Sequence, residues 1–149
     1  MKTLVVDDEV VTVKMLKRLF SRFGQCVSAT NGYDALEFVK IAYDEGEPFD
    51  ILIMDVVMPG LNGFETYSAI RDLEFSLGIE KDSQTKIIIM TGLGISREIF
   101  ELHKTSCMAY LYKPIEVSEL MQVLQKNNIL PQASQATQEP QAEPSLPVD

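Results

Sequence analysis

The chain has 149 residues, of which 46% are hydrophobic, and its formal net charge at pH 7 is -9. This length supports one sizeable hydrophobic core and is short for two. No apolar stretch approaches the roughly 20 residues that span a bilayer. The acidic balance and the scattered Lys and Arg argue against a nucleic-acid surface, which needs clustered basic side chains. We therefore expect a cytoplasmic protein that neither inserts into a membrane nor binds nucleic acid.

The two cysteines, Cys26 and Cys107, give little support to a disulfide framework or a metal site. Two thiols are few for a chain of this length, and no Cys or His lies nearby at the spacing of metal ligands. We expect both cysteines to be small, buried hydrophobic side chains.

The composition changes at Pro131, after which the chain is rich in Pro and Gln and has hardly any large apolar residue. Such a segment buries too little surface to offset the entropy lost on ordering. We predict a folded domain over residues 1–130 and a disordered, acidic Pro/Gln-rich tail over residues 131–149.

Short apolar runs alternate with stretches that have the 3.6-residue period of amphipathic helices. The expected strands are residues 4–6, 26–29, 51–54, 87–90 and 109–112. The expected helices are residues 13–23, 35–42, 64–75, 96–104 and 117–126. This alternation predicts an α/β fold: a doubly wound, five-stranded parallel sheet with five helices on its two faces. The connection from about residue 75 to residue 86 is long, and the sequence gives it no role.

Polar residues follow the predicted strands at one edge of this sheet. Asp7 and Asp8 follow the first strand, Asp55 the third, Thr91 the fourth and Lys113 the fifth. Because parallel strands end at the same edge, we expect these five side chains to converge where ligands bind in such folds.

Three converging carboxylates repel one another by roughly 4 kcal/mol per close pair at an effective dielectric near 20. A hard cation such as Mg²⁺, which takes oxygen ligands, relieves this repulsion. A lysine and a hydroxyl opposite the acids can receive a phosphoryl oxygen. The arrangement suits phosphoryl transfer to a carboxylate, with Asp55 as the nucleophile.

Four segments of the chain resemble the receiver domain of two-component response regulators. They read VVDDE at 5–9, IMDVVMPGLNG at 53–63, IIIMTG at 87–92 and YLYKP at 110–114. The resemblance covers about residues 1–127 and implies a flavodoxin-like, CheY-like fold. It also implies a stand-alone regulator that signals to a separate protein, and it identifies neither the kinase, the effector, the pathway nor the oligomeric state.

The resemblance implies a metal site and a phosphoacceptor. Asp8, Asp55 and the backbone carbonyl of Val57 would bind Mg²⁺ (or Mn²⁺), and Asp7 would hold a metal-bound water. Asp55 would accept a phosphoryl group from a histidine kinase or a histidine phosphotransfer protein, so the chain would be a signalling phosphoprotein rather than an enzyme.

The resemblance also implies a switch. Lys113 would pair with the phosphoryl group and Thr91 would bond to it, while Tyr110 would fill the space that Thr91 vacates. The apolar Val57 and Leu93 stand where side chains influence attack by water, and we predict a comparatively long-lived acyl phosphate.

Other functions remain open. A haloacid-dehalogenase-like Mg²⁺ phosphatase also uses an aspartate nucleophile, but it needs a second acid two residues later, where this chain has Val57. A flavodoxin-like electron carrier needs a hydroxyl- and glycine-rich loop after the first strand. An intermediate phosphorelay shuttle has the same chemistry as a terminal regulator, and a non-phosphorylated pseudo-receiver is least favoured because all five site positions are intact.

Overall fold

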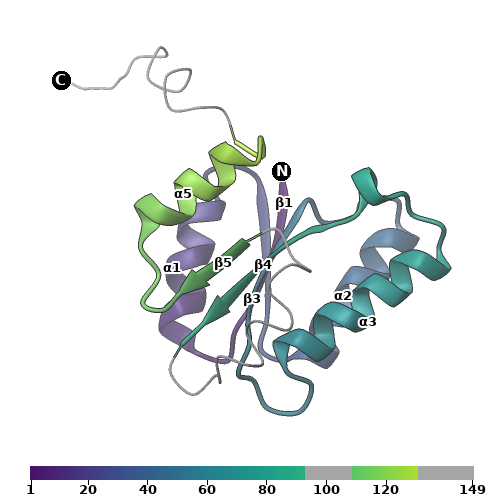
Figure 1. Ribbon diagram of the computed structural model, residues 1–149, viewed down its shortest axis with the longest axis horizontal. Coiled ribbons are helices and arrows are strands. Elements are labelled where there is room, and N and C mark those ends of the chain that lie inside the picture. Colours follow the sequence, from purple (N-terminus) through teal and green to yellow (C-terminus); the bar gives the residue numbers. More distant parts are fainter. Residues whose placement is uncertain (93–108, 131–149) are drawn as a thin grey trace. The chain divides into compact units, whose positions relative to one another are not determined.

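Five parallel strands form a single sheet in the computed structural model, which describes residues 1–92 and 109–130 (Figure 1). The strands are β1 (Lys2–Val6), β2 (Gln25–Ala29), β3 (Ile51–Asp55), β4 (Lys86–Thr91) and β5 (Ala109–Tyr112). Their order across the sheet is β2-β1-β3-β4-β5. The predicted five-stranded, doubly wound parallel sheet is therefore confirmed.

The strand order reverses beside β1. The chain passes from β1 to β2 on one side and then returns to β3 on the other side. All five residues of β3 are buried, which fits its unbroken apolar run. The connections that follow β1 and β3 therefore leave the carboxyl edge of the sheet in opposite directions. Ligands bind at this point in α/β folds of this kind.

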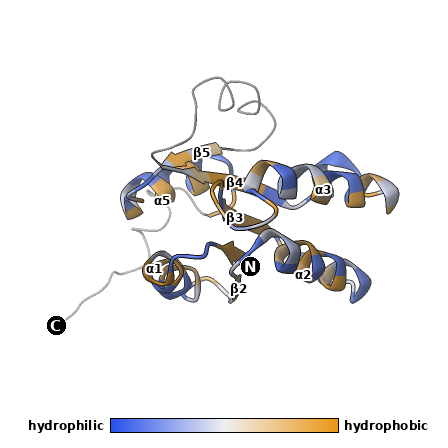
Figure 2. Cartoon of the chain, turned by 90° about the horizontal axis from the view of Figure 1, so that it is seen from below, coloured by the Kyte–Doolittle hydropathy of each residue, from blue (hydrophilic) through white to orange (hydrophobic). Residues whose placement is uncertain are grey.

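Helices cover both faces of the sheet. Helix α1 (Val10–Phe20) lies on one face, whereas α2 (Gly32–Asp44) and α3 (Gly63–Ser76) lie side by side on the other (Figures 1 and 2). The helix α1 buries Leu16 and Phe20 completely. A short 3₁₀ helix, Lys81–Ser83, interrupts the long connection between α3 and β4.

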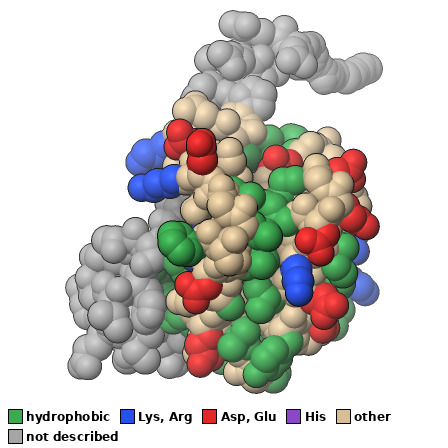
Figure 3. All heavy atoms as spheres, turned by 90° about the vertical axis from the view of Figure 1, so that its right-hand side faces the viewer, with side chains coloured by type: hydrophobic (Ala, Val, Ile, Leu, Met, Phe, Trp, Pro, Cys, Tyr) green, Lys and Arg blue, Asp and Glu red, His purple; other side chains and the backbone are tan. Residues whose placement is uncertain are grey.

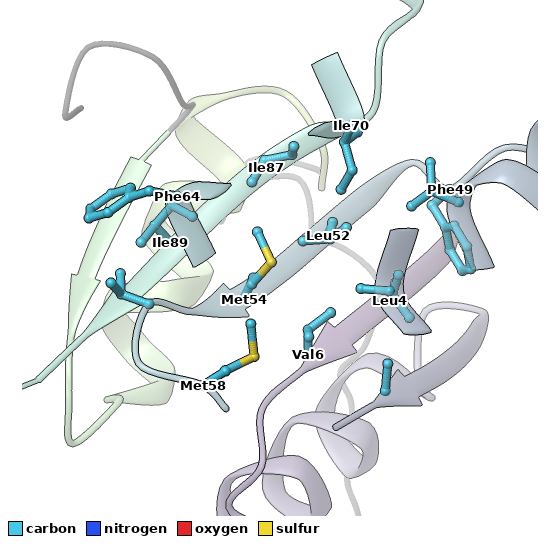
Figure 4. Packing of buried hydrophobic residues seen from close by; sticks show 14 of the residues in the cluster. Leu4, Val6, Phe49, Leu52, Met54, Met58, Phe64, Ile70, Ile87 and Ile89 are labelled. Carbon is cyan, nitrogen blue, oxygen red and sulfur yellow. The ribbon is translucent and has the colours of Figure 1, made fainter. Parts of the chain in front are cut away.

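The main hydrophobic core lies between the sheet and the pair α2 and α3 (Figure 4). The strands contribute alternate residues to it, as the period of two requires. Its members include Leu4, Val6, Leu52, Met54, Ile87 and Ile89 from the strands and Ala35, Val39, Phe64 and Ile70 from the helices. Full burial of one such large side chain stabilises a fold by roughly 1.5–3 kcal/mol. This layer therefore holds the strands in place, and with them the residues at their carboxyl ends.

A buried polar network holds the long connection before β4. Glu74, completely buried in α3, accepts hydrogen bonds from Arg71 Nη1 at 2.6 Å, from the Thr85 backbone N–H at 2.9 Å and from the Tyr43 hydroxyl. Arg71 also donates to the Thr85 carbonyl at 2.9 Å, and the Thr85 hydroxyl donates to the Phe49 carbonyl at 2.9 Å. The connection is thereby tied at both ends to the amino edge of the sheet.

Some expected boundaries need correction. Helix α1 ends at Phe20 rather than near residue 23, and Gly24 follows with φ +147°. A Cβ at Gly24 would lie 1.9 Å from the Met1 carbonyl oxygen, so this close approach of two backbones requires glycine. Asp55 and Thr91 are the last residues of β3 and β4 rather than the residues after these strands. Cys26 is a free, half-buried thiol and not fully buried as expected.

From Pro114 the chain forms a second unit, whose described part contains helix α5 (Val117–Lys126). This helix has the predicted bounds and buries Leu120 and Leu124. The expected helix at 96–104, Cys107 and the tail at 131–149 lie outside the described residues, so the division into a 1–130 domain and a 131–149 tail stays a prediction. No helix within 1–92 or 109–130 has the length and apolar character of a membrane span.

Candidate functional site

Three carboxylates meet at the carboxyl edge of the sheet. Asp7 and Asp8 follow β1, and Asp55 ends the neighbouring strand β3. Val6 pairs with Met54 in register, which places the next residue of each strand side by side. One carboxylate oxygen from each of the three acids lies within 4.8 Å of the others. Asp7 and Asp55 are buried, whereas Asp8 is exposed.

Lys113 brings a positive charge to these acids from the end of β5. Its ammonium nitrogen lies 2.8 Å from Asp7 Oδ2 and 3.3 Å from Asp55 Oδ2. Its backbone N–H donates to the Thr91 carbonyl at 2.7 Å, which fixes the start of this side chain beside β4. Burial lowers the pKa of Lys113, but pairing with Asp7 and Asp55 outweighs burial and raises it overall. The lysine is therefore a permanent cation at this site.

Asp55 is held in an environment that disfavours its charge. Burial raises the pKa of Asp55, and the nearby charge of Asp7 raises it further, while Lys113 opposes both effects. The net shift is upward. A cation at this edge would therefore stabilise the ionised form of Asp55.

Glu9 also contacts the lysine, which the sequence reasoning missed. Its Oε1 lies 3.3 Å from Lys113 Nζ and accepts a hydrogen bond from the Thr12 hydroxyl at 2.7 Å. These contacts, Thr12 first and then Lys113, lower the pKa of Glu9. The only available signal was the third acid in the run Asp7, Asp8, Glu9.

The loop after β3 is fixed close to Asp55. The Gly63 N–H donates to the Val56 carbonyl at 2.8 Å, and a Cβ at Gly63 would lie 2.5 Å from the Asp55 carbonyl oxygen. Asn62 caps helix α3 through a capping box in which its side chain and that of Glu65 each accept the other's backbone N–H. The loop leaves β3 along a path that only glycine permits at residue 63.

Of the other predicted residues, Thr91 and Val57 lie at this edge, whereas Tyr110 lies within β5. Thr91 is buried at the end of β4, and Val57 is 53% exposed with its N–H 3.4 Å from Asp55 Oδ1. Tyr110 in β5 is half-buried and packs against the main core. Leu93 lies outside the described residues. Of the predicted residues, Asp7, Asp8, Asp55 and Lys113 form the centre of the site.

The donor set fits a hard divalent cation. Carboxylate oxygens are the ligands that Mg²⁺ and Mn²⁺ take in proteins. The exposed Asp8 borders solvent, so an ion can reach the buried Asp7 and Asp55 from that side. One lysine does not balance three acids, and added positive charge would reduce their repulsion.

Replacing Asp55 with Asn is expected to raise the free energy of unfolding of the metal-free protein at pH 7. The folded-state pKa of Asp55 is raised above its ordinary value of 3.8, so ionisation of Asp55 opposes folding. This cost is absent below pH 3.8 and complete above the raised pKa. Urea unfolding in EDTA should therefore show a gain for the variant at pH 7 that shrinks as the pH falls toward 4.

The exposed Asp72 in α3 provides the matched control. Asp72→Asn makes the same change of charge outside the cluster of Asp7, Asp8 and Asp55, and it should leave the free energy of unfolding nearly unchanged. Added Mg²⁺ should stabilise the wild type more than Asp55→Asn. A variant less stable than the wild type in EDTA would contradict the expectation.

Comparisons with known proteins agree with this geometry. Residues 3–125 match the response regulator receiver domain. The chemotaxis protein CheY of Thermotoga maritima is 31% identical over 127 residues, which cover 84% of this chain and 95% of that protein. The sensor histidine kinase GacS of Pseudomonas protegens is 32% identical over 126 residues. The chain spans only 13% of GacS and 6% of the hybrid signal transduction histidine kinase B of Dictyostelium discoideum.

Solved structures give the same result. The receiver domain of the histidine kinase CKI1 from Arabidopsis thaliana, complexed with Mg²⁺ and BeF₃⁻, superposes with a TM-score of 0.70 at 25% identity, over 87% of this chain and 90% of that one. The chemotaxis protein CheY4 of Vibrio cholerae has a TM-score of 0.63 at 26% identity, over 84% and 96% of the two chains. The sheet, the acids at its carboxyl edge and these matches agree, and the chain belongs to the family of response regulator receiver domains of two-component systems.

Proposed function

We propose that this chain is a CheY-like phosphoacceptor in which Asp55 takes a phosphoryl group from a phosphohistidine. The donor is a sensor histidine kinase or a histidine phosphotransfer protein. In this step an Asp55 carboxylate oxygen forms the new P–O bond while the P–N bond to histidine breaks. The electron pair of the P–N bond stays on the imidazole nitrogen, which takes up a proton from solvent. The observation that carries the proposal is that Asp55 lies beside the acids Asp7 and Asp8 and that the ammonium of Lys113 is 3.3 Å from Asp55 Oδ2.

The acids suit a divalent cation as cofactor. Asp8, Asp55 and the Val57 carbonyl would hold Mg²⁺ or Mn²⁺, and Asp7 would hold a water bound to it. When bound, the ion supplies positive charge that offsets the charge of the transferred phosphoryl group. The three acids need such charge because Lys113 alone leaves them in excess.

Lys113 and Thr91 would act on the phosphoryl group from the opposite side. The ammonium of Lys113, which remains charged, would pair with a phosphoryl oxygen. The Thr91 hydroxyl would bond to the same group, and Tyr110 would then change its packing at β5. Such a switch shifts a pre-existing equilibrium only by as much as the phosphoryl group favours one state.

The charge of the surface favours a protein effector over nucleic acid. Over the face formed by α2 and α3, isolated Lys and Arg side chains lie among acidic ones (Figure 3). Nucleic-acid binding would need a basic stripe, which this face lacks in the part of the chain that the structure describes. We propose a cytoplasmic signalling protein that acts on a separate protein. A haloacid-dehalogenase-like phosphatase is disfavoured because it needs a second acid at the position of Val57.

Intact mass tests the proposed function. Incubation with acetyl phosphate and Mg²⁺ should add a single phosphate to the wild type and none to Asp55→Asn, because the acyl phosphate forms only on Asp55. EDTA should prevent the reaction, and Asp72→Asn should react like the wild type. A wild type that gains no phosphate and also fails to bind beryllium fluoride would contradict the proposal.

The lifetime of the adduct is a separate prediction. Val57 and Leu93 are apolar and offer no hydrogen bond to an attacking water, so the acyl phosphate should persist well beyond seconds after acetyl phosphate is removed. Mass spectra taken at intervals in Mg²⁺ give the decay rate. Val57→Asn should shorten the lifetime, and complete decay of the wild-type adduct within seconds would contradict this role.

A further inference from the structure

Lys113 has a third acidic partner, Glu9, that the proposed phosphotransfer does not use. We propose that Glu9 is a positioning residue for Lys113: it occupies the solvent-side contact of the ammonium in the unphosphorylated protein and releases it to an incoming phosphoryl group. The inference rests on the proposed function and deepens it. In this role, Glu9 lowers the affinity of the site for an anion.

Glu9 is oriented toward the lysine by two contacts of its own. Its backbone N–H donates to Asp7 Oδ1 at 2.9 Å, which fixes the residue beside the first acid. Its Oε1 accepts the Thr12 hydroxyl at 2.7 Å and lies 3.3 Å from Lys113 Nζ. The carboxylate is therefore held between α1 and the lysine rather than left free in solvent.

The ammonium of Lys113 has three N–H donors and three acidic neighbours. These are Asp7 at 2.8 Å, Asp55 at 3.3 Å and Glu9 at 3.3 Å. A phosphoryl oxygen that pairs with the lysine must replace one of these contacts. One of the three acids therefore gives up its contact with Lys113 when the phosphoryl group arrives.

Exposure decides which acid gives way. The side chain of Glu9 is 62% exposed, whereas those of Asp7 and Asp55 are 0% and 8% exposed. A buried carboxylate that loses its cation pays for desolvation without compensation. Glu9 can turn into water and be solvated there. Asp55 loses its carboxylate charge when it takes the phosphoryl group, so the comparison is between the two acids that stay charged, Asp7 and Glu9. Of these two, Glu9 is the one that Lys113 can release at the lower cost. Its negative charge opposes the approach of an anion until it turns away.

Binding of beryllium fluoride in saturating Mg²⁺ tests this exchange without any donor protein. Glu9→Gln should bind the anion about two- to fivefold more tightly, the scale expected for an exposed ion pair. Glu9→Asp keeps the charge but is one methylene too short to reach Lys113, so it should also bind more tightly than the wild type. Thr12→Val, which frees the Glu9 side chain, should shift in the same direction by less.

Glu37→Gln is the matched control, since Glu37 is an exposed acid in α2 and the substitution changes the net charge equally. It should bind beryllium fluoride like the wild type. The side-chain ammonium signal of Lys113, observed by ¹⁵N NMR in EDTA, gives a readout independent of the loaded site. Glu9→Gln and Glu9→Asp should move this signal, and Glu37→Gln should not.

Three outcomes would overturn the inference, and they separate a failure of the role of Glu9 from a failure of the proposed function. If the wild type takes phosphate but Glu9→Gln and Glu9→Asp bind beryllium fluoride as it does, only the role of Glu9 is wrong. If Glu37→Gln tightens the binding of beryllium fluoride as much as Glu9→Gln does, the effect comes from net charge, and again only the role of Glu9 is wrong. If the wild type neither takes phosphate nor binds beryllium fluoride, the proposed function fails and the inference fails with it.

Discussion

Replacing Lys113 with methionine is expected to slow phosphorylation by acetyl phosphate by about 10²–10³-fold, the usual effect of removing one fixed donor to developing charge. The same change should tighten Mg²⁺ binding. The ammonium lies 2.8 Å from Asp7 and 3.3 Å from Asp55, so it competes with a metal ion for the same negative charge. Initial rates from intact mass and a Mg²⁺ titration followed by fluorescence or calorimetry measure the two effects.

The opposite signs of these effects make the test specific. A variant that merely distorts the edge of the sheet would lose both phosphorylation and Mg²⁺ binding. Lys86→Met, at the exposed first residue of β4, is the control for loss of one positive charge and should change neither quantity appreciably. Phosphorylation of Lys113→Met at the wild-type rate would contradict the role assigned to the lysine.

Replacing Arg71 with methionine is expected to lower the free energy of unfolding by about 3–5 kcal/mol, because it leaves the buried Glu74 carboxylate without its cation. Glu74 is completely buried, and the guanidinium is 2.6 Å from it. Arg71 also donates to the Thr85 carbonyl at 2.9 Å, so the variant loses two hydrogen bonds. Urea unfolding measures the change.

The double variant Arg71→Met with Glu74→Leu isolates the cause. If an unpaired buried charge is the main cost, removing both partners should recover much of the lost stability. Both variants should bind Mg²⁺ like the wild type, because this network lies at the amino edge of the sheet and the acids lie at the carboxyl edge. An Arg71→Met protein as stable as the wild type would contradict the expectation.

The centre of the candidate site could be predicted because it depends on strand ends. Asp55 ends an apolar run and Asp7 follows another, and parallel strands bring such positions together whatever the details of packing. Lys113 was found in the same way, at the end of the last strand. The distances themselves and the pairing of Lys113 with each acid required the structure.

The contact of Glu9 with Lys113 could not be predicted, since the two residues are 104 positions apart and the contact depends on how one exposed side chain is turned. Helix α3 shows a second limit. Hydrophobic periodicity predicted this helix, yet its Phe75 is 86% exposed while the neighbouring Glu74 is completely buried. Glu74 lies inside because Arg71, Thr85 and Tyr43 satisfy its carboxylate, and these partners come from segments that no local pattern connects.

The hydrogen bond from the Thr85 N–H to Glu74 holds together the two ends of the connection between α3 and β4. A longer connection would therefore leave the position of the sheet unchanged. Gly78 lies in this stretch with open space around its Cβ position. Each doubling of a flexible loop costs only about 0.6 kcal/mol of closure entropy. A peptide tag or fluorescent reporter could therefore be inserted at Gly78 and still leave Asp55 undisturbed, giving a label on the working molecule at the edge remote from its chemistry.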